Sequence, residues 1–246
     1  LQGSHKICKK ILKSKRPIII IGESALIGDT GEYVFECLKS FIVKNNLIKQ
    51  DWNPLNILSQ TASKVGAISL GAYLTSQSNN FLFFDKIDKE KFEFLYLLGA
   101  DNFNINKENK FIVYQGSHGD KGAEIADVVL PGAAYTEKDG LFFNTEGRLQ
   151  KAYKASYPPG SAKEDWKIVY ELAQILKKPL NFNTQEELYQ KIFESIKTSN
   201  IGGFSDVKTN KFTAKKTNFI NGEIEIKKVD YYHTNSIARS SKTMSE

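Results

Sequence analysis

FIVYQGSHGDKGAEIADVVLPG, residues 111–132, constrains the fold most, because it contains two apolar runs that each end at a glycine. Two further runs have the same form, PIIIIG over residues 17–22 and FLYLLG over residues 94–99. None of these runs alternates with polar residues, which is typical of strands covered on both faces, as in a parallel sheet flanked by helices. The sequence therefore predicts four strands, each of which turns sharply at a glycine into the next element.

Helical patterns lie between and after these strands. A Ser, Thr or Asp followed three residues later by Glu is the arrangement of a capping box, which marks a helix start. Such boxes occur as DTGE at 29–32, SAKE at 161–164 and TQEE at 184–187. The segment LNILSQTASKVGAISLG, residues 55–71, predicts one more helix, which ends near Gly71.

Strands that alternate with helices indicate an α/β fold, here a Rossmann-like parallel sheet flanked by helices and joined by right-handed crossovers. We predict that residues 1–199 form this domain. Residues 200–246 carry weaker patterns, and we expect them to form an extended tail over the surface.

The net charge of +6 lies at one end of the chain, because residues 1–16 contain six Lys and Arg and no acidic residue. Nucleic-acid binders spread basic side chains over a face, so this distribution argues against a nucleic-acid partner. Ile7, Cys8, Ile11 and Leu12 fall on one helical stripe, which favours an amphipathic helix over a targeting peptide. No apolar run approaches the roughly 18 residues of a membrane-spanning helix.

Metal ligands are scarce and scattered. The two cysteines, Cys8 and Cys37, are too few for an iron–sulfur cluster, which takes four thiolates or two thiolates and two histidines. His5, His118 and His233 show no zinc spacing either. We expect no metal site and no cofactor in this chain.

Glycines follow the third predicted strand at intervals of three, at Gly116, Gly119 and Gly122. Backbone N–H groups in such a turn can cradle a phosphate. The spacing matches neither nucleotide-binding glycine pattern, so we expect a tight turn, with Gly116, His118, Gly119 and Gly122 as candidates for a vestigial phosphate loop. His118 and Asp120 could serve as base and orienter, but no nucleophile with its own base is evident. Asp120 could equally cap the helix that follows.

The loop region after Pro131 contains four charged candidates for acid–base chemistry, Glu137, Asp139, Glu146 and Arg148. Paired carboxylates act as acid and base when their pKa values are pushed apart. A Glu and an Arg two residues apart more often form a local ion pair or bind backbone groups. We therefore expect no catalytic residue here, with Asn144 and Thr145 hydrogen-bonding a turn that Glu146 and Arg148 brace.

IADVVLPGAAYTEKDGLFFNTEGRLQ at 125–150 and PPGSAKEDWKIVYELAQIL at 158–176 together resemble the pattern of molybdopterin oxidoreductases, which formate dehydrogenases share. VYQGSHGDKGAEIADVVLPGAAYTEK at 113–138 narrows the resemblance to the large iron–sulfur subunits of respiratory complex I. YYHTNSIARSSKTM at 231–244 is similar to the C-terminal end of those subunits.

This resemblance implies a molybdopterin oxidoreductase-like domain without a molybdenum cofactor, from the last part of the subunit. In that family, iron–sulfur clusters in the N-terminal half pass electrons from NADH towards ubiquinone, so none of the family's metal ligands falls on this chain. The expected role is a non-catalytic structural domain. The expected location is the matrix side of the mitochondrial inner membrane, or the cytoplasmic side in a bacterium.

The resemblance also implies partners: the other subunits of the peripheral arm and the cluster-bearing N-terminal part of the same subunit. We expect the basic N-terminal helix and the residues around Tyr231, Tyr232 and His233 to dock on them. One alternative is a fragment of a molybdopterin-dependent dehydrogenase, such as a formate dehydrogenase, whose loop at 116–122 contacts a pterin dinucleotide phosphate. Another is a free nucleotide-binding module.

Overall fold

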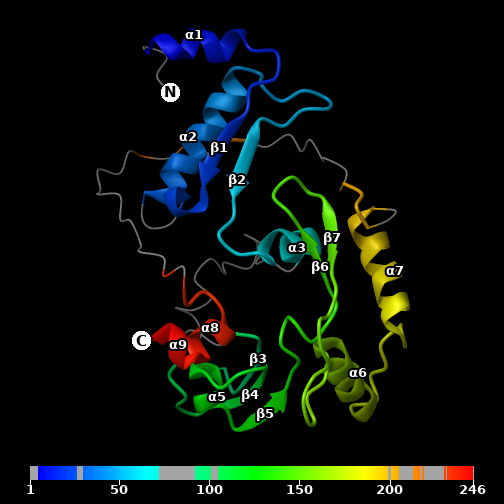
Figure 1. Cartoon of the computed structure of the whole chain (residues 1–246). Coiled ribbons are helices and arrows are strands. Elements are labelled where there is room, and N and C mark those ends of the chain that lie inside the picture. The colour runs from blue at the N-terminus through cyan, green and yellow to red at the C-terminus, as the bar shows by residue number, and fades with distance from the viewer. Residues whose placement is uncertain are drawn as a thin grey trace. The chain divides into compact units, whose positions relative to one another are not determined.

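The computed structural model describes residues 5–26, 30–71, 92–100, 105–198, 201–204, 213–216, 218, 230 and 232–245. The chain divides into two compact units (Figure 1). The first unit contains Leu1–Ser69, Phe142–Gln150 and Ile196–Lys228, and the second contains Leu70–Leu141, Lys151–Ser195 and Val229–Glu246. The boundary at residue 199 stays a prediction.

The first unit is built around a two-stranded parallel sheet. Its elements are α1 (Lys6–Lys13), β1 (Ile19–Gly22), the 3-10 helix η1 (Glu23–Leu26), α2 (Gly31–Lys44), β2 (Leu55–Leu58) and α3 (Lys64–Ser69). Ile19 lies opposite Leu55 in the register, and both pack against a buried cluster of Phe41, Ile42 and Leu47. In Figure 1 helix α2 runs alongside this sheet, so the apolar face of the helix and the sheet bury one another.

The prediction of a single helix over residues 55–71 is wrong. Residues 55–58 form β2, and only Lys64–Ser69 is helical. Leu55–Leu58 pairs in parallel with Ile19–Gly22, a partner more than 30 residues away in sequence, and this pairing overrides the local helical pattern. In the predicted box at 29–32, Asp29 lies outside the described residues, and Thr30 precedes α2 without a side-chain capping bond.

The second unit contains a three-stranded parallel sheet with β4 (Phe111–Gly116) between β3 (Phe94–Leu98) and β5 (Val128–Pro131). The short helix α5 (Lys121–Ile125) joins β4 to β5. Side chains of β3 and β4 form a buried cluster together with Ile105, which precedes β4; the strand residues in it are Leu95, Leu97, Ile112 and Tyr114. The predicted α/β class and the four strands that end at glycines are confirmed.

Two further strands, β6 (Gly140–Phe143) and β7 (Leu149–Ala152), were not predicted and pair as a hairpin. The N–H of Asn144 donates to the carbonyl oxygen of Arg148 at 3.1 Å and closes the turn. Gly147 takes a φ of +80° in this turn, a conformation that favours glycine. Leu149 is buried and exchanges backbone hydrogen bonds with Gly202 and Gly203.

Helices α6 (Asp165–Ile175) and α7 (Gln185–Ile196) follow the hairpin. The capping box at 161–164 is wrong, because α6 begins after Glu164, and the Glu164 carboxylate accepts from Trp166 Nε1 at 2.9 Å. The cap at 184–187 is confirmed on one side: Thr184 Oγ1 accepts from Glu187 N at 3.2 Å. Glu187 reaches one residue further back than a capping box requires, to the N–H of Asn183 at 2.6 Å.

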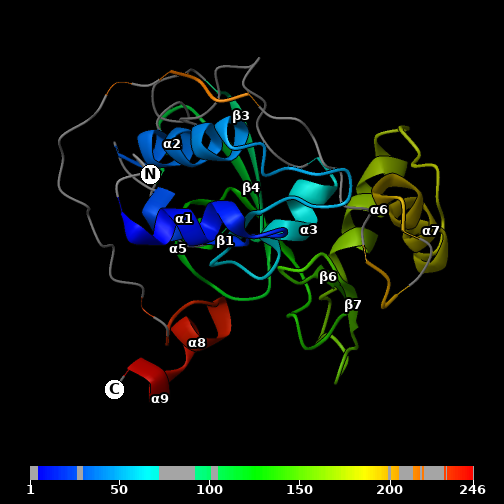
Figure 2. The same ribbon diagram turned by 90° about the horizontal axis from the view of Figure 1, so that it is seen from above.

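The predicted tail, residues 200–246, is described only in part, and Tyr231 lies outside the described residues. Its last described residues form α8 (Ser236–Ser240) and α9 (Lys242–Ser245), which lie next to each other in Figures 1 and 2. Asn235 caps α8 by accepting from Ala238 N at 2.9 Å. Among the described helices, none has both the length and the apolar character of a membrane span.

Candidate functional site

The candidate site lies at the carboxyl edge of the sheet in the second unit, where β4 and β5 end. Open parallel sheets usually bind ligands at this edge, just beyond the ends of the strands. The ends of the two strands are joined by a hydrogen bond of 2.8 Å from Gly132 N to Gly116 O. A cavity of about 230 Å³ opens here, and its lining includes Gly99, Gly116, Ser117, Lys138, Asp165 and Ser236.

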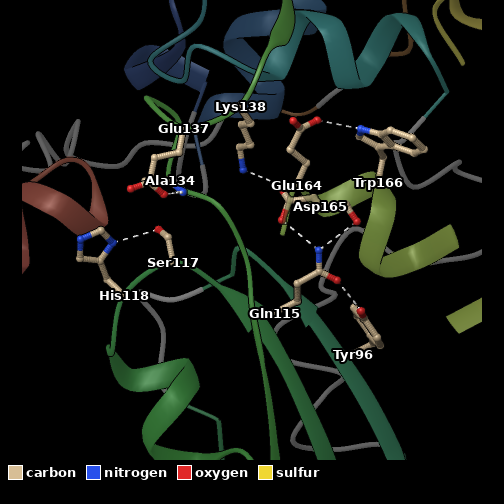
Figure 3. Close-up of polar contacts among 10 residues, drawn as sticks. All are labelled: Tyr96, Gln115, Ser117, His118, Ala134, Glu137, Lys138, Glu164, Asp165 and Trp166. Atoms are coloured by element: carbon tan, nitrogen blue, oxygen red, sulfur yellow. Dashed lines mark hydrogen bonds and ion pairs between the residues drawn. The ribbon is translucent and has the colours of Figure 1, made fainter. Parts of the chain in front are cut away.

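A network of polar side chains crosses this edge (Figure 3). Gln115 is fully buried at the end of β4, and its Nε2 donates to Asp165 Oδ1 at 2.9 Å. Gln115 Oε1 accepts from the hydroxyl of Tyr96, and Lys138 forms an ion pair with Asp165. Burial, followed by the charge of Asp165, raises the pKa of Tyr96, which keeps its hydroxyl a donor. The negative charge of Asp165 and the positive charge of Lys138 therefore neutralise each other within the protein.

The predicted carboxylates Glu137 and Asp139 have structural partners. Glu137 Oε2 accepts from Ala134 N at 2.9 Å, while Glu137 N donates to Ala134 O at 2.9 Å, so the two residues close a turn. Asp139 pairs with Lys151 at 2.8 Å and accepts from Lys154 N at 2.9 Å. The hydrogen bond from Lys151, then that from Lys154 N, lowers the pKa of Asp139, whereas a general acid needs a raised one.

The turn at 144–148 is held by Asn144, as predicted. Its Oδ1 accepts from Glu146 N at 3.0 Å and from Arg148 N at 2.9 Å. Within the described residues no ion pair joins Glu146 to Arg148. The Arg148 guanidinium instead lies over the ring of Phe204, 4.8 Å from its centroid, and the Glu146 carboxylate accepts from Asn144 Nδ2 at 3.4 Å.

Two glycines of the predicted phosphate loop are required by packing. A Cβ at Gly116 would lie 2.2 Å from the Tyr114 hydroxyl oxygen, and one at Gly122 would lie 2.7 Å from Ala100 O. At Gly119 nothing lies within 4 Å of such a Cβ. Packing against Tyr114, and for Gly122 also against Ala100 O, therefore explains these two glycines without any ligand.

The carboxylate of Asp120 already occupies the N-terminus of α5. Asp120 Oδ1 accepts from Lys121 N at 2.9 Å, and Asp120 Oδ2 binds Arg239 Nε at 2.7 Å. Burial opposes ionisation of Asp120, but the hydrogen bonds from Arg239 and Lys121 N outweigh it, so its pKa is lowered. This carboxylate repels a phosphate at the backbone N–H groups of the loop, and the residues present do not fit one.

Of the two roles considered for Asp120 from the sequence, the structure shows the helix cap and not the orienter of His118. His118 Nδ1 instead lies 2.9 Å from the hydroxyl oxygen of Ser117, a residue that no sequence signal marks. A serine nucleophile needs a base that a third group orients. Among the described residues, the third group considered from the sequence, Asp120, binds Arg239 and so does not complete a catalytic triad with this pair.

In the described ranges, no three His, Cys, Asp or Glu side chains gather closely enough to hold a metal ion. Cys8 is buried and Cys37 is half-buried. His5 Nδ1 accepts from Ile7 N at 3.2 Å and caps α1. The expectation that the whole chain lacks a redox centre stays a prediction.

Comparison of the sequence with known proteins shows the family to which the chain belongs. Residues 1–175 match the molybdopterin oxidoreductase family. The chain is 41% identical to the NADH-ubiquinone oxidoreductase 75 kDa subunit of Reclinomonas americana, over 100% of this chain and 36% of that protein. It is 37% identical to an NADH-quinone oxidoreductase subunit of Rickettsia bellii (strain RML369-C), over 98% of this chain and 34% of that protein.

A further relative is the corresponding NADH-quinone oxidoreductase subunit of Rickettsia conorii (strain ATCC VR-613 / Malish 7), 35% identical over 99% of this chain and 35% of that protein. The chain thus spans about a third of the length of the curated relatives it matches. The family match covers the parallel sheet, the polar network at its carboxyl edge and helix α6. The chain belongs to the molybdopterin oxidoreductase family.

Proposed function

We propose that this chain is a structural domain of the large iron–sulfur subunit of a respiratory NADH:quinone oxidoreductase, with no catalytic group of its own. In this proposal the electrons pass from NADH to quinone through clusters held outside the chain. The observation that carries the proposal is the carboxyl edge of the sheet, where Gln115 and Lys138 both bind Asp165. The edge where this fold would bind a ligand is thereby tied together by the protein itself.

Similarity supports the assignment to this enzyme. The relatives named as subunits of NADH-ubiquinone and NADH-quinone oxidoreductases match nearly the whole chain, at 35–41% identity. Proteins this similar share a fold, and the satisfied network at the sheet edge is consistent with a part that contributes architecture.

A fragment of a molybdopterin-dependent dehydrogenase is the second candidate, and the glycine loop argues against it. A pterin dinucleotide needs backbone N–H groups that are open to its phosphates. In this loop Asp120 occupies the N–H of Lys121, and the Tyr114 ring fills the space beside Gly116 and Gly122. We derive no chemistry through such a cofactor.

The proposal includes a location and partners. The chain would lie on the matrix side of the mitochondrial inner membrane, or on the cytoplasmic side of a bacterial membrane. It would contact peripheral-arm subunits and the cluster-bearing part of the same subunit. Exposed apolar side chains on the basic helix α1, Ile7 and Leu12, and the exposed Tyr232 are suited to such contacts.

The test is purification of the tagged full chain from its native membranes, followed by subunit identification, metal analysis and NADH:quinone turnover. We expect a cluster-bearing subunit to co-purify, with iron but without stoichiometric molybdenum or extractable pterin. Recovery of molybdenum or pterin in proportion to the chain would overturn the proposal.

A matched pair of variants separates architecture from catalysis. Lys138→Met leaves Asp165 without its cation, so we expect less assembled enzyme but unchanged turnover per assembled enzyme. Lys178→Met changes an exposed lysine and serves as the control. Full assembly of the Lys138 variant with lost turnover would contradict a purely structural role.

A further inference from the structure

The C-terminal segment crosses the loop that follows β4. We call Asp230 and residues 232–245 the strap; it belongs to the second unit, as does the loop. Arg239 Nε donates to Asp120 Oδ2 at 2.7 Å, and only 17% of each side chain is exposed. Arg239 also donates to the carbonyl oxygen of His233 at 3.2 Å. Arg239 therefore links the strap to the loop and also links two parts of the strap to each other.

His233 joins two parts of the strap, Asp230 and Met244, through its two ring nitrogens. Nδ1 lies 2.7 Å from Asp230 Oδ2, and Nε2 lies 2.9 Å from the carbonyl oxygen of Met244. A carbonyl oxygen only accepts, and the Asp230 carboxylate already accepts from the N–H groups of residues 232 and 233. Both ring nitrogens must therefore donate, which requires the imidazolium form.

The strap also forms part of the wall of the cavity at the sheet edge. Ser236, the first residue of α8, lines that cavity together with Ser117, Lys138 and Asp165. Release of the strap would remove this part of the wall and open the cavity to solvent.

We propose that the strap is a pH-sensitive closure of this cavity, shut while His233 is an imidazolium and Asp120 is a carboxylate. When His233 gives a proton to water, one ring nitrogen is left with a lone pair in place of its N–H. This lone pair faces an acceptor, so the hydrogen bond at that nitrogen is lost. Loss of this bond separates one end of the strap from His233, while the contact of Arg239 with Asp120 remains. This property belongs to the chain itself and does not depend on the proposed function.

The charged groups around His233 set the direction of its titration. The hydrogen bond to Asp230, followed by that to Met244 O, raises the pKa of His233, against smaller opposing effects of burial and then of the Arg239 charge. A raised folded-state pKa means that the stabilisation is complete below the ordinary value of about 6.5 and is lost as pH rises through the raised value.

Asp120 sets the acid limit. Burial raises its pKa, but the bonds from Arg239 and Lys121 N outweigh burial and lower it. Its contribution is therefore present above the ordinary value of about 3.9 and is lost as pH falls through the lowered value. The strap is shut between these two titrations and opens as pH rises through the titration of His233.

The test is amide hydrogen exchange of residues 232–245 in the full chain from pH 5.5 to 9, corrected for the intrinsic pH dependence of exchange. We expect protection to fall roughly three- to tenfold as His233 deprotonates. In His233→Gln, whose side chain does not titrate, protection should be low and independent of pH. His5→Gln and His118→Gln are matched controls that should keep the step.

The methyl resonance of Met244, the only methionine in the sequence and assigned with Met244→Leu, is a second reporter and should shift with the same midpoint. Flat protection in the unmodified chain, or a step that persists in His233→Gln, would overturn the proposal. If that variant does not fold, Asp230→Asn replaces it. Loss of the carboxylate should move the midpoint to lower pH, and an unchanged midpoint would count against the strap.

Discussion

Gln115 Nε2 donates to both the side chain and the backbone carbonyl of Asp165, at 2.9 and 3.3 Å, and so ties the end of β4 to the first turn of α6. These residues are 50 positions apart in sequence. Gln115 is fully buried, and its amide oxygen accepts from Tyr96. A buried polar network whose members are all satisfied fixes one geometry, while a broken one is costly. The tie therefore stabilises the edge where a ligand would otherwise bind.

Gln115→Leu should lower the free energy of unfolding by about 2–4 kcal/mol, because it leaves the Tyr96 hydroxyl and the Asp165 oxygens without their buried partner. Urea unfolding followed by circular dichroism measures the loss. Gln150→Leu replaces an exposed glutamine in β7 and should change stability by less than about 0.5 kcal/mol. Equal effects of the two substitutions would show that the tie contributes nothing.

The glycines after β4 give a test that separates packing from ligand binding. Gly122→Ala places a Cβ 2.7 Å from Ala100 O and 2.9 Å from the Tyr114 ring, and the overpacking should cost about 1–3 kcal/mol. This cost outweighs the gain of about 1 kcal/mol that alanine gives in a helix.

Gly119→Ala is the matched control, because its Cβ meets nothing within 4 Å. Thermal unfolding of both variants should show a lower midpoint for Gly122→Ala and an unchanged or slightly higher one for Gly119→Ala. A phosphate loop would respond in the opposite way, with both variants stable and a loss of anion binding.

The four strands that end at glycines could be predicted because their apolar runs are unbroken, as buried parallel strands require. Strand β2 could not, since the apolar residues of Leu55–Leu58 are followed by a helical pattern, and such short runs are ambiguous between helix and strand. Its identity depends on Ile19–Gly22, which supplies the hydrogen bonds from far earlier in the chain.

In the candidate site too, some contacts could be predicted from the sequence and others could not. The role of Asn144 follows from contacts two and four residues away, so the local sequence is enough to predict it. Gln115 binds Asp165, 50 residues away, and Asp120 binds Arg239, 119 residues away, and no pattern in the sequence points to these two contacts. From the sequence, Asp120 could be an orienter of His118 or a helix cap, and the structure shows it capping α5 and bound to Arg239.

Asn144→Ala should destabilise the hairpin turn by about 1 kcal/mol, because the N–H groups of Glu146 and Arg148 lose their acceptor. Asn144→Asp keeps an acceptor oxygen and should restore most of the loss, less a small repulsion from Glu146. Hydrogen exchange at residues 144–148 measures the turn directly. Full protection in the alanine variant would contradict this assignment.

Glu36 on α2 is a buried carboxylate whose partners are Lys39 Nζ and Lys215 N, both at 2.6 Å. Burial opposes its ionisation, but the hydrogen bonds from Lys39 and from Lys215 N outweigh burial and lower its pKa. A lowered folded-state pKa stabilises the fold above the ordinary value of about 4.3, and the contribution is lost as pH falls through the lowered value.

Glu36→Gln should therefore destabilise the chain by about 1–2 kcal/mol at pH 7, and this difference should shrink as pH falls below about 4. Urea unfolding at pH 7, 5 and 3.5 tests both statements. Glu32→Gln removes the same charge from an exposed position on the same helix and should have little effect at any of these pH values. Only a contribution from charge disappears when Glu36 is protonated. A loss of unfolding free energy in Glu36→Gln that is equal at pH 7 and pH 3.5 would therefore show that the shape of the side chain, and not its charge, stabilises this part of α2.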